Sequence, residues 1–567
     1  MVDALNSLPA ELVLQILDFA PVSHIAGLLR LNKAWNSFIN THQDAVYAST
    51  TKVWRPPDSR DLAFLSKTQS FAKYFEGTSS WKELCKRQTL LTRAWNRRDP
   101  ITRESIIQVG NDAVWRFRVD FERRFVLSTS QQGGLNVTDL DSGDLLWRLS
   151  NSEVWPFAHL EYQDGKAVWD REGNAVEVWQ TDIEGLPRGN FRQVAILPHE
   201  HQTRGFQVSY NILCVVSTEG ICYVYDMAHV PPRLKSKIAI EEDAVGHLDQ
   251  NEDVVMVSMG KNGYHFYDKI TGARVGILDP RMSLQFHHIH HPPPEANSTV
   301  SAENAFYSLP SIDVFPPRRP SKDRLTPIRV AGGPLHRAEN EAYTKLGDDD
   351  WGAALFSGSM MAAISRGGRL LVCLDWRTCL QKPKFFERLS YIIECRSDGS
   401  GFDLGGWLSF RNNRVMFEVQ DRVYVVTLRD YGTVDDIEPC GHRPSYAFTT
   451  SSVPQLAVPV SFMALFDDCI LSTYTTLGWR RRTAERDVED AGQTNRFRIF
   501  PTKTIRILSL APNLEPGSVS DDGELATTLY AAEDDRHTNI LEIMDMLSAD
   551  EEDTDDDIVE TDADGSW

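Results

Sequence analysis

The chain has 567 residues, too many for a single hydrophobic core, so we expect several domains or one large repeat fold. Apolar residues make up 41% of it and aromatic residues 10%, which is typical of a protein that folds over most of its length. The formal net charge of -21 would repel the phosphates of nucleic acids and anionic membranes, so we expect protein partners and neither nucleic-acid nor membrane binding.

The first residues lack the features of a secretion signal. Asp3 and Glu11 stand where a signal peptide carries cations, and Pro9 and Pro21 interrupt the apolar runs. No stretch reaches the roughly 20 apolar residues of a membrane helix. The eight cysteines are scattered without paired close spacing, which is typical of reduced thiols. We therefore expect a location in the cytoplasm, the nucleus or both.

Residues 5–40 predict two helices that meet at Pro21 and carry more large aliphatic residues than they can bury against each other. The apolar positions are Leu8, Leu12, Ile16, Leu17 and Phe19 in the first helix and Ile25, Leu28, Leu29, Trp35, Phe38 and Ile39 in the second. Two interpretations fit this surplus. The helices either pack on the rest of their own chain or present an apolar face to another protein.

The order of these residues resembles a known module, the F-box. The matching pattern runs over roughly residues 5–45 and comprises Leu8-Pro9-x-Glu11-Leu12, Ile16-Leu17, Pro21, Ile25, Leu28 and Trp35. The chain departs from the family at Ala20, where a large aliphatic residue is usual, and at Asn32, where cysteine is common. The resemblance implies docking on the small adaptor subunit of cullin-RING ubiquitin ligases. The contact positions that it implies are Leu8, Pro9, Leu12, Ile16, Leu17, Ile25 and Leu28.

Residues 46–100 predict a mostly helical connector that is interrupted at Gly77, with Ser79 or Ser80 as the cap of a second helix. The pattern of Trp81, Leu84, Cys85, Leu91 and Trp95 is similar to the segment that joins F-box to propeller in F-box proteins with WD repeats. The same pattern is also expected of helices whose apolar residues only pack on the first strands of the next domain. A stiff connector would hold a bound substrate at a set distance from the transferring enzyme.

Beyond residue 100, short apolar runs alternate with Gly and Asp turns, which predicts antiparallel meanders. Equivalent strands end at Asp139, about Gln180, Asp226 and Asp268, in steps of 41, 46 and 42 residues. A period of 40 to 45 residues with about four strands per unit is typical of a β-propeller, here with about seven blades. Two β-sandwiches would fit the turns but not the even steps.

The repeats resemble WD repeats only loosely. Gly246-His247 precedes Tyr267-Asp268 much as Gly-His precedes Trp-Asp in that family, but Trp-Asp is missing from these strand ends. We expect an α+β multidomain protein with a helical N-terminus and an all-β propeller. The expected units are an F-box at 1–45, a connector at 46–100, blades at 101–279 and 351–515, a disordered insertion at 280–350 and an acidic disordered tail at 516–567.

Two polar clusters are candidate sites. His287, His288, His290 and His291 could bind a metal, but no acidic or cysteine partner has a fitting spacing, so a solvated loop is favoured. Arg480, Arg481 and Arg482 are candidate substrate-binding residues because guanidinium groups pair with acidic or phosphorylated side chains. The alternative for these arginines is a solvated hairpin tip.

Motifs of catalysis are missing from the sequence: it has no Walker loop, dinucleotide fingerprint, His-Glu-x-x-His or Gly-x-Ser-x-Gly. The gap between Cys373 and Cys379 does not match a redox pair or a zinc knuckle. We therefore expect a non-catalytic protein without cofactor or metal. The resemblance implies the substrate-recognition subunit of a ubiquitin ligase, with the adaptor, a cullin and a protein substrate as partners. The alternatives are a propeller scaffold or adaptor without ubiquitin function, and a propeller enzyme with a dispersed site.

Overall fold

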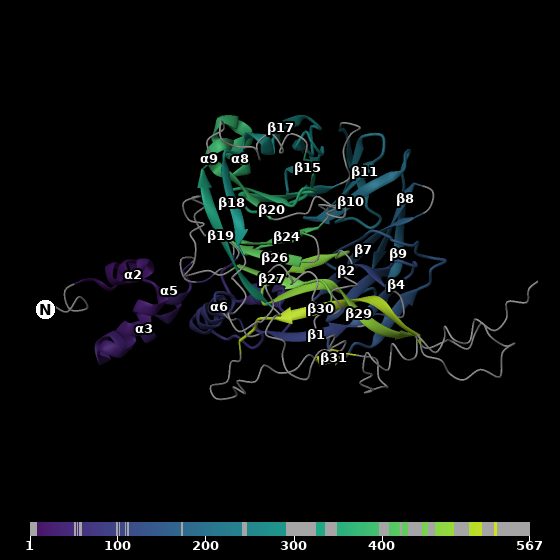
Figure 1. Cartoon of the computed structure of the whole chain (residues 1–567). Coiled ribbons are helices and arrows are strands. Elements are labelled where there is room, and N and C mark those ends of the chain that lie inside the picture. The colour runs from purple at the N-terminus through teal and green to yellow at the C-terminus, as the bar shows by residue number, and fades with distance from the viewer. Residues whose placement is uncertain are drawn as a thin grey trace, which may run out of the picture.

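The computed structural model places an arm of helices beside a ring of antiparallel sheets (Figure 1). It describes residues 8–49, 53, 55, 59–97, 100, 102–107, 109, 113–171, 174–240, 247–290, 325–334, 349–395, 407–419, 422–428, 445–451, 460–480, 498–512 and 527–529. No helix in these ranges is both long enough and apolar enough to span a bilayer.

The helices of the arm are α2 (Ala10–Phe19), α3 (Val22–Leu31), α4 (Lys33–Thr41), α5 (Gln43–Tyr47), η1 (Ala63–Lys67) and α6 (Trp81–Trp95). Two of these helices, α4 and α6, begin at a residue whose side chain caps them. Pro9 and Pro21 directly precede α2 and α3. The second predicted helix is in fact two, because Asn32 is extended and its side chain accepts the Trp35 N–H at 2.9 Å to cap α4. Ser80, one of the two serines expected to cap this helix, caps α6 by accepting the Glu83 N–H.

Four-stranded antiparallel sheets make up the first part of the ring. Four separate sheets follow each other along the chain: β2–β5 (Val114–Asp120, Phe125–Ser130, Leu135–Asp139, Leu145–Leu149), β6–β9 (Leu160–Gln163, Lys166–Arg171, Ala175–Gln180, Arg192–Pro198), β10–β13 (Thr203–Ser209, Ile212–Ser217, Ile221–Asp226, Arg233–Ala239) and β14–β17 (Leu248–Gln250, Val254–Ser258, Tyr264–Asp268, Arg274–Leu278). The four strand ends predicted from the sequence period are the ends of β4, β8, β12 and β16, the third strand of each sheet.

The remaining strands form two larger sheets. A ten-stranded sheet contains the antiparallel runs β20–β23 (Trp351–Ser357, Met360–Ser365, Arg369–Cys373, Ser390–Glu394) and β24–β27 (Leu408–Arg411, Arg414–Val419, Arg422–Thr427, Ser445–Thr449). The last sheet contains β28 (Met463–Leu465), β29 (Cys469–Arg480), β30 (Arg498–Ser509), β1 (Arg103–Ile107) and β31 (Thr527–Leu529). The short helices η2 (Pro280–Met282), α8 (Trp376–Gln381), η4 (Pro383–Phe385) and α9 (Phe386–Leu389) lie in connections.

Contacts between the first strands close the ring. β2, β6, β10, β14, β20, β24 and β28 each contact the next, and β2 returns to β29 and β30 of the last sheet. β1 pairs antiparallel with β30, so a strand from the N-terminal side completes the last sheet. The expectation of small helices followed by a propeller-like β fold is therefore confirmed. A pair of β-sandwiches is not the architecture.

Two strands in the predicted insertion tie neighbouring sheets together. β18 (Gln285–His290) pairs parallel with β23, β19 (Thr326–Pro334) pairs antiparallel with β27, and β18 and β19 pair with each other. Gly332, with φ of +151°, allows this close approach, because a Cβ there would lie 2.6 Å from the Phe286 carbonyl oxygen. The expectation of a largely disordered segment is thus wrong for these strands. It is also wrong for Thr527–Leu529 in the predicted tail, which pair parallel with β1.

The buried side chain of His287 should make the pairing of β18 with β19 sensitive to pH. Its side chain is buried against Tyr391, and neither ring nitrogen has a hydrogen-bond partner among the described residues. Burial lowers its pKa to about 4, so between about pH 6.5 and 4 the unfolded chain binds a proton that the folded chain lacks. We expect the free energy of opening β18 and β19 to fall by about 2 kcal/mol when the pH is lowered from 7 to 5. Hydrogen exchange of 285–290 and 326–334, corrected for intrinsic rates, measures this loss, and His287→Phe should remove it.

Candidate docking helix and its attachment to the propeller

One face of α2 is apolar and exposed. Leu8, Leu12, Ile16 and Phe19 recur at helical spacing, and the exposed fractions of Leu12, Ile16 and Phe19 are 43%, 56% and 86%. Pro9, the residue that precedes the helix, is exposed beside them. Figure 1 shows that α2 and α3 lie at the end of the arm, on the far side of α6 from the sheets. The apolar face is therefore open to a partner.

Three of the seven predicted contact residues are buried or half-buried and do not lie on the exposed face. Leu17 and Ile25 are 2% and 0% exposed and belong to the hydrophobic core of the arm, so they cannot touch a partner while the arm is folded. Leu28 is half-buried against the same core. The assignment of Leu17 and Ile25 as contact residues is wrong for this structure. Their role is to hold α2 and α3 together.

The predicted set of contact residues leaves out two exposed apolar residues that lie near it. Phe19 ends the stripe that starts at Leu8, and its spacing already placed it on the same face. Leu31 at the end of α3 is 65% exposed. The F-box pattern includes neither residue, whereas helical periodicity already places Phe19 among the apolar positions of the first helix.

A buried carboxylate attaches the connector to the last sheet. Asp468, in the turn between β28 and β29, is 0% exposed and accepts hydrogen bonds from Ser70 Oγ at 2.6 Å, Phe71 N at 2.8 Å and Ala72 N at 3.0 Å. Burial raises the pKa of Asp468. Three donors from one stretch of the connector thus meet on one side chain from a sheet almost 400 residues later, which fixes the position of that stretch.

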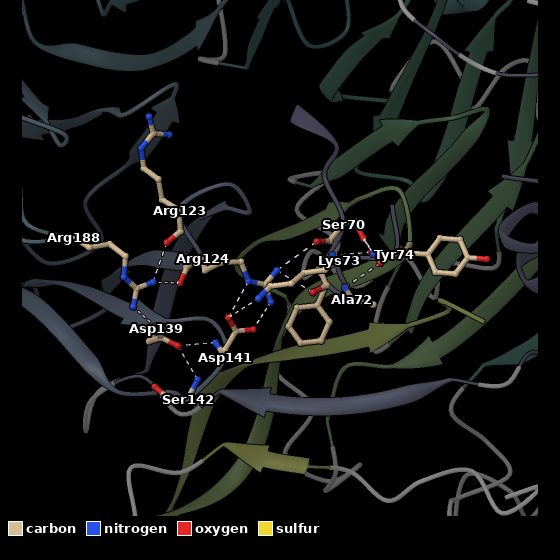
Figure 2. Close-up of polar contacts among 12 residues, drawn as sticks. Ser70, Ala72, Lys73, Tyr74, Arg123, Arg124, Asp139, Asp141, Ser142 and Arg188 are labelled. Carbon is tan, nitrogen blue, oxygen red and sulfur yellow. Dashed lines mark hydrogen bonds and ion pairs between the residues drawn. The ribbon is translucent and has the colours of Figure 1, made fainter. Parts of the chain in front are cut away.

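A second polar group attaches the connector to the first sheet of the ring (Figure 2). Arg124, in the turn after β2, donates from Nη1 to the Phe71 carbonyl at 2.9 Å and forms an ion pair with Asp141. Lys73 from the connector approaches the same carboxylate at 3.6 Å. The hydrogen bonds from Arg124 lower the pKa of Asp141, so this carboxylate stays charged near neutral pH. The neighbouring Arg188 donates to the Arg124 carbonyl at 3.0 Å.

Helix α6 completes the attachment. The Trp95 Nε1 group donates to the Asp467 carbonyl at 3.0 Å, and the Tyr446 hydroxyl donates to the Trp95 carbonyl at 3.0 Å. Leu84 and Trp95 share one hydrophobic core with Tyr446 of β27 and other residues of the last two sheets. The arm and the ring therefore form one packed unit, as a stiff connector requires.

Charged residues from two neighbouring sheets meet aromatic residues from two others where the first strands of the sheets contact one another. Arg118 pairs with Glu161 at 2.5 Å, and Arg116 contacts His159 Nε2 at 3.3 Å. Burial and the neighbouring Arg116 lower the pKa of His159 to about 4, so its ring is neutral at pH 7. The Arg116 guanidinium stacks on Trp407, before β24, at 4.2 Å, and that of Arg118 on Phe462, before β28, at 4.2 Å. No local sequence motif could reveal this group, because its members come from separate repeats.

The other predicted clusters do not form a site in the described residues. His287, His288 and His290 lie on β18, where successive side chains point to opposite faces, and His291 lies outside the described residues. Within those residues no group of three or more His, Cys, Asp or Glu side chains is placed to hold a metal ion. Arg480 is the last residue of β29, and the structure describes only its backbone, while Arg481 and Arg482 lie outside the described residues.

Comparisons with known proteins give a limited result. No model of a protein family matches the chain, and no curated protein matches it. Among solved structures it is similar to the computationally designed protein Ika8 (13% identity, TM-score 0.38) and to BamB from Moraxella catarrhalis (11% identity, TM-score 0.38), each match covering 71% of this chain and 98% of the other. A chain of a mitotic checkpoint complex matches at 9% identity and a TM-score of 0.31, covering 64% of this chain and 74% of that one. At these TM-scores the similarity carries no argument about function.

Proposed function

We propose that this chain is the substrate-recognition subunit of an F-box-type cullin-RING ubiquitin ligase. In this role α2 docks on the adaptor subunit, and a ring of seven blades binds the protein substrate. The observation that carries the proposal is the exposed apolar face of α2 at the end of the arm. It bears the Leu8-Pro9-x-x-Leu12 start of the F-box pattern, followed by Ile16.

The proposed contribution to ubiquitin transfer is proximity, with no chemical step on this chain. A substrate held near a conjugating enzyme that carries ubiquitin reacts as if the transfer were intramolecular, provided that the two proteins are held at a fixed distance and orientation. The hydrogen bonds at Asp468 and Arg124 support such an arrangement, because they join the connector to two sheets of the ring. The alternative function, a propeller scaffold without ubiquitin function, would not need the α2 face to bind this adaptor.

The test is co-elution of the full chain with the adaptor subunit on size exclusion. We expect wild type to form a stable complex and the double variant Leu8→Ala, Pro9→Ala to lose at least about tenfold in affinity, since two contacts at one edge of the interface are truncated. The matched control is Val275→Ala, Ile277→Ala on β17, which removes exposed apolar groups from the ring instead. Well-folded wild type that forms no complex would refute the ligase role and leave the scaffold function.

A further inference from the structure

Two buried thiols lie in contact at the edge of the ring. Cys373 is the last residue of β22, and Cys379 lies in α8, which follows after a short turn. Their Sγ atoms are 3.7 Å apart, and both residues are 0% exposed. The gap of six residues matched no redox motif in the sequence, but a strand-to-helix turn brings the two side chains together.

The turn between the two cysteines joins two neighbouring sheets. Asp375 caps α8 by accepting the Thr378 N–H at 3.0 Å. The ring of Trp376 packs on Phe266 of β16, with the ring centres 5.6 Å apart, and on Phe356 of β20, with the ring centres 4.8 Å apart. Helix α8, which carries Cys379, follows β22 in the chain and packs against β17 of the neighbouring sheet. A bond between the two thiols would therefore fix α8 at the junction of these sheets.

We propose that Cys373 and Cys379 are an oxidative modification site that forms a reversible disulfide with hydrogen peroxide as the oxidant. A disulfide needs the sulfur atoms to move from 3.7 Å to about 2.05 Å. Only the six-residue α8 needs to shift, because Cys373 is held in the middle of a sheet. The outer side of this connection is open, since Arg377 and Phe385 are both exposed, so a small oxidant can reach the pair through a local opening.

The reaction balances with one peroxide molecule. The Cys379 thiolate attacks one peroxide oxygen, the O–O bond breaks, and a sulfenic acid and hydroxide form. The Cys373 sulfur then attacks the sulfenic sulfur, the S–O bond breaks, and the hydroxyl group leaves as water with the Cys373 proton. Two thiols are oxidised, and the peroxide is reduced to two waters. A hydrogen bond with Cys373 lowers the pKa of Cys379, which makes Cys379 the attacking group.

Cys214 and Cys222 provide an internal comparison. They are buried on β11 and β12, where Cys214 lies opposite Val224 and Cys222 lies opposite Val216. These two thiols also interact with each other, but they are offset along adjacent strands, and both strands are held in the interior of a four-stranded sheet. Bridging them would require a shift of the sheet, so we expect this pair to stay reduced when the Cys373–Cys379 pair oxidises.

Trypsin gives a direct readout because Arg377 lies between the two cysteines. Cleavage yields peptides 370–377 and 378–384, each with one cysteine, so the disulfide appears as a cross-link between two peptides. Peptide 205–233 carries both Cys214 and Cys222. We expect the native full chain, treated with hydrogen peroxide and then alkylated, to show the cross-link, and dithiothreitol to remove it. Oxidised protein should melt roughly 2–5 °C higher, since a short loop is closed, whereas Cys379→Ser should show neither change.

Two results would overturn the proposal. Cys373 and Cys379 could both remain fully alkylated, after denaturation of the treated protein, at peroxide concentrations that oxidise exposed thiols of a reference protein. The cross-link could also form only in step with oxidation of peptide 205–233. This second result would mean that the thiols react after the ring unfolds, and the contact in the folded protein would then be packing alone.

Discussion

The substitution Leu12→Asp is expected to abolish adaptor binding while the arm and the ring stay folded. Leu12 is 43% exposed in the free chain, so an aspartate there remains hydrated. In the proposed complex the same carboxylate would be buried in an apolar interface without a partner, which costs several kcal/mol. The affinity should fall by at least ~100-fold. Titration calorimetry with the purified adaptor measures the affinity, and thermal unfolding shows whether the fold is kept.

Two further variants make this result specific. Leu145→Asp introduces the same charge at an exposed leucine on β5 of the ring, and adaptor binding should not change. Leu17→Ala lies one residue beyond the exposed Ile16 but removes a core side chain, so it should lower the stability of the arm by about 2–5 kcal/mol. If Leu12→Asp binds the adaptor as wild type does, the α2 face is not the docking surface.

The split between Leu12 and Leu17 shows what the sequence could not provide. The two residues lie about 140° apart around α2, on different apolar faces, and an apolar face reports only that this side of the helix avoids water. Whether the face is covered by the same chain or by a partner depends on α3, α4 and α5, whose packing no single-helix pattern encodes. The exposure of Leu12 and the burial of Leu17 became visible only when these helices were placed together.

The period of the strands was predictable because it is a local property. The strands that end at Asp139, Gln180, Asp226 and Asp268 pair with strands next to them in sequence, so turn residues and apolar runs define them. The sequence did not predict β18, because one of its two partner strands, β23, lies about 100 residues later in the chain. Its histidines also look like loop residues, since nothing in the local sequence shows that His287 is covered.

The attachment of the arm was also beyond sequence reasoning, and it allows the second large prediction. Asp468→Asn keeps the size of the side chain but replaces one carboxylate oxygen with an NH₂ group. The two oxygens together accept Ser70 Oγ, Phe71 N and Ala72 N, so at least one of these donors would face another donor. An unpaired buried donor costs about 1–3 kcal/mol, and bonds to a charged acceptor are the stronger kind. We expect amide protons of 70–74 to exchange about 5- to 150-fold faster, which is this cost expressed as a ratio of opening constants.

The matched comparison is Asp141→Asn, which affects the neighbouring group in Figure 2. Asp141 is 49% exposed, so its pairs with Arg124 and Lys73 are screened by water and should contribute little. Exchange at 70–74 should therefore change less than about fivefold in that variant. If Asp468→Asn leaves exchange at these amides unchanged, the buried carboxylate does not hold the connector. If exchange accelerates while adaptor affinity stays at the wild-type value, Asp468 fixes the arm on the ring without contributing to the docking face.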